Sequence, residues 1–115
     1  MKLIIKRGQR DKKGLLGGHK GVSFALECRV ELTDIEKDLV NRYKAMDYVL
    51  TYREDREGKK IPGLRVSNML AGVQQEIDDV ATLLGNEDVI KGACQEFKNL
   101  LSIMASFGGE EVIEF

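Results

Sequence analysis

The stretch VSFALECRVEL, residues 22–32, alternates apolar side chains with other side chains without a break. Successive side chains of a β-strand point to opposite faces of a sheet, so this pattern predicts a strand with one apolar face. The other face carries Glu27, Arg29 and Glu31 and would meet water, which favours antiparallel pairing. The apolar face is formed by Val22, Phe24, Leu26, Cys28, Val30 and Leu32.

The residues before this strand predict a shorter one. Lys2–Arg7 (KLIIKR) is apolar and β-branched at its centre, and a glycine-rich stretch follows it. At eleven residues, the strand over 22–32 is longer than this six-residue partner. We therefore expect its excess length to pair with a C-terminal strand or with another copy of the chain.

The residues after it predict a helix followed by strands. Thr33-Asp34-Ile35-Glu36 has the spacing of a capping box, in which the side chains of Thr33 and Glu36 each bond to the other's backbone amide. Tyr48–Arg53 returns to strand composition, and Leu64–Val66 is a possible short strand after Pro62.

The last third of the sequence predicts two helices and a strand. The first helix would begin at Ser67 or Asn68 and end at Gly85, and Asn86 would cap the second, which ends before Gly108. Glu110–Phe115 (EEVIEF) predicts a final strand. The expected fold is a single α+β domain over 1–115, in two layers. A mostly antiparallel or mixed sheet, in the order β-β-α-β-(β)-α-α-β, has its helices packed on one face.

Composition supports a folded chain inside the cell. Of 115 residues, 43% are apolar and 32% are charged, a balance typical of globular proteins. The apolar runs are too short to span a bilayer, so we expect a cytoplasmic location. Cys28 and Cys94 lie on predicted apolar faces, which indicates reduced core thiols.

Positive charge is concentrated near the amino end. Residues 1–20 hold seven Lys or Arg and one acid, whereas residues 21–115 hold eleven and eighteen, which gives +6 and −7. Within residues 6–21 five glycines accompany these cations, a combination that lets backbone amides and positive side chains approach an anion. The predicted anion-binding residues are Arg7, Arg10, Lys12, Lys13, His19 and Lys20. The alternative is a solvated hairpin loop without a ligand.

The sequence gives little support for a nucleotide-binding motif, a catalytic site or a metal site. The glycine spacing fits neither a P-loop nor a dinucleotide fingerprint. His19 is the only histidine, and two distant cysteines do not supply the paired ligands of a zinc site, so we predict no catalytic residue, metal or cofactor.

Three hypotheses follow for the function. The first is a non-enzymatic binding or assembly module whose basic glycine-rich loop contacts nucleic acid, a phosphorylated ligand or an acidic protein. The second is a structural homodimer formed through edge strands, by Val22–Leu32 or Val112–Phe115. The third is a small enzyme for a phosphorylated or carboxylated substrate, with Lys20 and His19 at its site.

Overall fold

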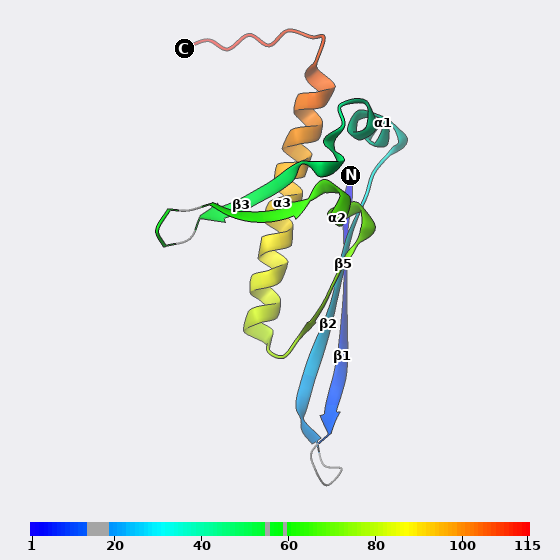
Figure 1. Cartoon of the computed structure of the whole chain (residues 1–115), viewed down its shortest axis with the longest axis vertical. Helices are drawn as coiled ribbons and strands as arrows, with labels where there is room; N and C mark the ends of the chain where they lie inside the picture. The colour runs from blue at the N-terminus through cyan, green and yellow to red at the C-terminus, as the bar shows by residue number, and fades with distance from the viewer. Residues whose placement is uncertain (14–18, 55, 59) are drawn as a thin grey trace.

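The computed structural model describes residues 1–13, 19–54, 56–58 and 60–115. It contains a three-stranded and a two-stranded antiparallel sheet together with three α-helices, so the predicted α+β class is confirmed (Figure 1). The first six α-helices and strands along the chain follow the predicted order of two strands, a helix, two strands and a helix. The order of elements differs from the prediction only in the last third of the chain.

A long hairpin forms the first sheet. Strand β1 (Lys2–Lys13) pairs with β2 (His19–Glu31) from Lys2 opposite Glu31 to Lys13 opposite His19. The expected six-residue strand and long loop were therefore wrong, because most of the predicted loop is strand. Gly8 causes no break in β1, since it lies opposite Ala25 in regular register and does not have a positive φ.

The apolar face of β2 is confirmed. Leu26, Cys28 and Val30 are buried, whereas Glu27 and Arg29 between them are exposed. Strand β5 (Val73–Ile77) pairs with the other edge of β2, from Phe24 opposite Ile77 to Cys28 opposite Val73. The central strand therefore needs neither a C-terminal strand nor a second copy to pair over this length.

The capping box is also confirmed. Helix α1 (Asp34–Arg42) begins after Thr33, whose hydroxyl accepts from the Glu36 amide while the Glu36 carboxylate accepts from the Thr33 amide. A short 3-10 turn, Ala45–Asp47, then leads into the second sheet.

The second sheet consists of β3 (Val49–Glu54) and β4 (Lys60–Arg65). Strand β3 confirms the predicted strand over Tyr48–Arg53. Strand β4 overlaps the predicted Leu64–Val66 only at Leu64 and Arg65, because it begins at Lys60 and because Val66 already belongs to the next helix. Pro62 is tolerated within β4 because both strands of a two-stranded sheet are edges.

The region predicted as two helices forms a short helix, a strand and a long helix. Helix α2 (Val66–Ala71) ends at Gly72, whose φ of 100° no L-residue adopts easily, and β5 follows. Helix α3 (Val80–Ser106) then begins after Asp79, which accepts from the Thr82 amide, and it continues through Gly85. Gly85 does not end the helix, because an interior glycine only weakens a helix and α3 continues beyond it.

The predicted final strand is absent from the described chain. Helix α3 ends before Phe107, and Gly108 turns the chain with a φ of 89°. Residues 110–115 then run on without regular structure, away from both sheets (Figure 1). Without a neighbouring edge, a sequence of strand composition has no partner for its backbone groups.

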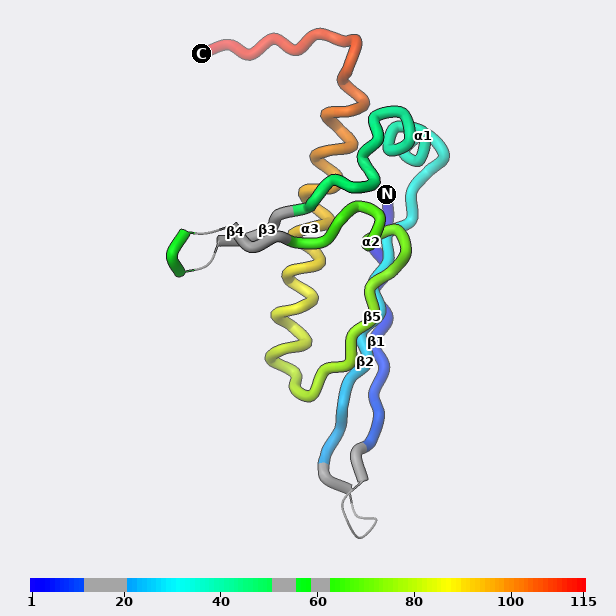
Figure 2. Tube along the Cα trace, in the orientation of Figure 1, coloured from blue at the N-terminus to red at the C-terminus, as the bar shows by residue number. Residues whose placement is uncertain are grey.

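Helix α3 joins the two sheets and anchors the core. It contacts β2, β3, β4 and β5, and its Phe97 and Ala93 are completely buried. The molecule nevertheless extends over 67 × 37 × 22 Å with a radius of gyration of 18.3 Å. A compact chain of this length would have a radius of about 13 Å. The β1–β2 hairpin and residues 110–115 lie away from the core and make the molecule elongated (Figure 2).

Candidate functional site

The far end of the hairpin projects beyond the rest of the sheet. Strand β5 reaches along β2 only to Phe24, so the segments 10–13 and 19–23 pair with each other alone. We call these two segments the hairpin arm. They extend past the N-terminal end of α3 (Figure 1), and at about 3.4 Å per residue they span about 15 Å.

The hairpin arm carries most of the predicted anion-binding residues. It holds Arg10, Lys12, Lys13 and Lys20 against the single acid Asp11, which gives a net charge of +3 with His19 neutral. The strand backbone brings the two halves of this set together, since Lys13 lies opposite His19 and Lys12 opposite Gly21. Arg10 is exposed to solvent, while the side chains at 12, 13, 19 and 20 lie outside the described part of the structure.

Arg7, the remaining predicted anion-binding residue, forms an ion pair with another part of the protein. Its Nε lies 2.5 Å and its Nη2 2.9 Å from the two carboxylate oxygens of Glu87 in α3. The Glu87 side chain is only 2% exposed, whereas that of Arg7 is 57% exposed. The bidentate hydrogen bond from Arg7 lowers the pKa of Glu87 although burial opposes this. The charge of Arg7 is therefore neutralised at the base of the hairpin.

A second polar contact joins the same surfaces. The Asn86 amide donates to the side-chain oxygen of Gln75 in β5, at 2.9 Å. Two hydrogen-bonded contacts thus hold the first turns of α3 against the inner face of the sheet. The hairpin arm begins immediately beyond them, so it projects from a fixed base.

The sequence contained a signal for this pair that the helix assignment obscured. With Asn86 as the cap of the second predicted helix, Glu87 falls in the first turn, where the helix dipole favours an acid. In the continuous α3 it instead lies between Leu83 and Ile90, both buried. A single acid within an apolar helical face indicates a buried carboxylate, which needs a cationic partner.

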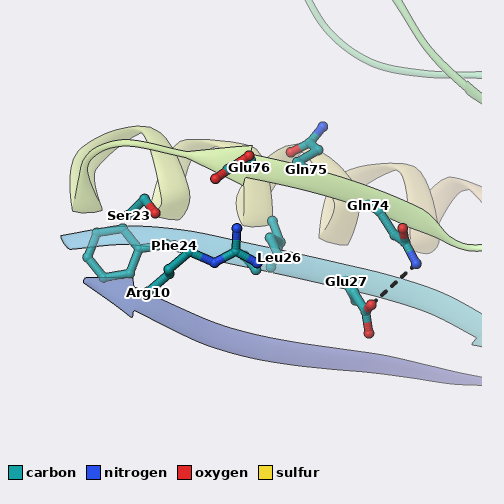
Figure 3. Close-up of a pocket in the computed structure, with 9 residues that line it drawn as sticks. Arg10, Ser23, Phe24, Leu26, Glu27, Gln74, Gln75 and Glu76 are labelled. Carbon is teal, nitrogen blue, oxygen red and sulfur yellow. Dashed lines mark hydrogen bonds between the residues drawn. The ribbon is translucent and has the colours of Figure 1, made fainter. Parts of the chain in front are cut away.

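The outer face of the sheet has a shallow hollow of about 260 Å³ at the base of the arm (Figure 3). Arg10 contributes a cation, but Glu27 and Glu76 also line the hollow. The Glu27 carboxylate accepts from the Gln74 amide at 3.3 Å. This mixed charge does not favour an anion, so the hollow is less suited to a phosphate than the arm beyond it.

Two observations on the described residues concern metal binding and cysteine chemistry. Within 1–13, 19–54, 56–58 and 60–115 no three His, Cys, Asp or Glu side chains are grouped to hold a metal ion. Cys28 and Cys94 are free and buried, as predicted, and burial raises the pKa of both thiols. Reactive cysteines require the opposite shift. No helix in the described ranges is long and apolar enough to cross a membrane.

Comparisons with protein-family models, with curated proteins and with solved structures found no match for this chain.

Proposed function

We propose that the chain is a non-enzymatic nucleic-acid-binding module that uses the hairpin arm to contact phosphates. The observation that carries the proposal is the projection of a two-stranded ribbon, with four cations and one acid, beyond the edge of β5. A cytoplasmic location remains the corresponding prediction from the sequence.

The geometry of the arm suits a duplex. A two-stranded antiparallel ribbon fits the major groove of B-form DNA, which is about 12 Å wide. Since β5 and α3 do not extend along the arm, both of its strands can approach the sugar-phosphate backbone (Figure 1). Neither segment of the arm contains Phe, Tyr or Trp, and Phe24, which pairs with β5, lies just outside the arm. Base stacking on single strands is therefore the less favoured mode.

The arm is also held in a way that favours binding. The Arg7–Glu87 and Gln75–Asn86 contacts fix the base of the hairpin against α3. A ribbon that is already paired loses less conformational entropy on binding than an unfolded basic segment would. The structural element and the charge thus support the same function.

Fluorescence anisotropy across a salt series tests the proposal. The probes are a 20-base-pair DNA duplex and a single strand of equal length. Each neutralised duplex phosphate contributes a log–log slope of about −0.9, so contacts by all four arm cations give about −3.6. Salt-independent binding, or no binding to either probe at low salt, would overturn it. An acidic protein or a phosphorylated small molecule would then become the better candidate partner.

A matched pair of variants separates the arm from overall charge. Lys12→Gln/Lys13→Gln/Lys20→Gln removes three arm cations, and Lys37→Gln/Lys91→Gln/Lys98→Gln removes three exposed lysines from α1 and α3. We expect the first variant to lose at least tenfold in affinity with a shallower salt slope. The second should lose much less, and equal losses would contradict a role for the arm.

A further inference from the structure

Residues 110–115 expose apolar side chains without any partner in the described chain. Val112 is 78% exposed, Ile113 63%, and Phe115 is fully exposed. None of these six residues forms regular structure. The segment EEVIEF nevertheless has strand composition, with three acids and three large apolar residues in six positions.

The edge of β1 is the complementary feature. In the three-stranded sheet the order is β1-β2-β5, so β1 pairs on one side only. Among the described residues no other strand or loop bonds to its outer edge. An unpaired edge of this length is a template for a further strand.

The side chains on the outer face of β1 alternate between cationic and apolar. Lys2, Ile4 and Lys6 share one face of the strand because they are two residues apart. In residues 110–115, Glu110, Val112 and Glu114 share a face for the same reason. One pattern is cation, apolar, cation and the other is acid, apolar, acid.

A single antiparallel register matches the two patterns. With Val112 opposite Ile4, Glu110 lies opposite Lys6 and Glu114 opposite Lys2. On the opposite face this register sets Ile113 opposite Leu3 and Phe115 opposite Met1, both of which already pack against the core, and it sets the acid Glu111 opposite Ile5. Opposite charges and apolar pairs directly across two strands are the favourable cross-strand combinations.

We propose that residues 110–115 of one copy add as a strand to the free edge of β1 in a second copy, antiparallel and with Val112 opposite Ile4. The exchange is reciprocal and gives a dimer with twofold symmetry. The donor is the second copy because Gly108 turns the segment away from the chain's own β1 (Figures 1 and 2). The arm remains outside this pairing, so the dimer presents two arms.

Charge reversal tests the pairing, with sedimentation velocity over a range of protein concentrations as the measurement. Lys2→Glu/Lys6→Glu and Glu110→Lys/Glu114→Lys should each weaken self-association by at least tenfold. The four-fold variant, which restores opposite charges in reversed order, should recover it. Lys37→Glu/Lys98→Glu changes two exposed lysines elsewhere and should leave association unchanged. A wild-type monomer at all concentrations, or no recovery in the four-fold variant, would overturn the proposal.

Cross-linking tests the register and the donor. Ile4→Cys/Val112→Cys sets two thiols directly opposite, within the 4.4–6.8 Å between Cα atoms that disulfides require. Oxidation should give a covalent dimer on a non-reducing gel. Ile4→Cys/Ile113→Cys sets the thiols on opposite faces and should cross-link at least tenfold less. A disulfide-linked monomer would overturn the assignment to a second copy, and equal cross-linking by both variants would overturn the register.

Discussion

Arg7 in β1 and Glu87 in α3 form a bidentate ion pair across eighty residues of sequence, with Nε–Oε1 and Nη2–Oε2 distances of 2.5 and 2.9 Å. The pair is asymmetric, since the carboxylate is almost fully buried and the guanidinium reaches solvent. Arg7 thereby satisfies a buried charge while keeping its own contact with water. The contact fixes the base of the hairpin arm on the helix that anchors the core.

Removing Glu87 should destabilise the protein. We expect Glu87→Ala to lower the free energy of unfolding by about 1–3 kcal/mol, the usual effect of losing a buried charged hydrogen-bonding group. Arg7→Met should also destabilise, because it leaves the carboxylate buried without its partner. Urea denaturation of both variants and of the double variant gives the coupling energy. Strict additivity would contradict a direct interaction.

The same pair predicts a pH dependence. Arg7 lowers the pKa of Glu87 below its ordinary value of 4.5, so the unfolded chain binds this proton at a higher pH than the folded chain does. The stabilisation is therefore complete above about pH 4.5 and is lost as the pH falls through the lowered pKa of the folded state. The difference in unfolding free energy between the wild type and Glu87→Gln should shrink from pH 6 to pH 3. A constant difference over that range would contradict the shift.

Local signals in the sequence predicted local structure well. The alternation over 22–32 predicted the central strand, and the spacing of Thr33 and Glu36 predicted the start of α1. Both depend on side chains next to one another along the chain, so the information is contained in a few consecutive residues.

The wrong predictions concern segments whose structure depends on contacts with residues far away in the sequence. Residues 73–77 have apolar spacing that also fits a helix, and they form β5 because β2 offers them a free edge. Gly8 lies inside β1 because Ala25 continues the pairing opposite it. The ion pair of Arg7 was missed for the same reason, since Glu87 comes close only after α3 packs on the sheet.

The capping box gives a local test of stability. Thr33→Ala removes the hydroxyl that accepts from the Glu36 amide and should lower the unfolding free energy by about 1 kcal/mol. Thr33→Ser keeps an acceptor at the same position and serves as the control. Thermal denaturation followed by circular dichroism should rank the wild type and Thr33→Ser close together, well above Thr33→Ala. Equal losses in the two variants would argue against the cap.

Substitution by alanine should change the stability of the protein in opposite directions at Gly85 and at Gly72. Gly85 lies inside α3, where an added Cβ would meet nothing within 4 Å, so Gly85→Ala should stabilise the protein by about 0.5–1 kcal/mol. Gly72 ends α2 with a φ of 100°, a conformation that alanine rarely adopts, so Gly72→Ala should destabilise it. Urea denaturation of the two variants measures both signs in one experiment. If α3 were two helices separated at Gly85, the first substitution would lose its benefit, because an alanine would then replace the residue that ends a helix.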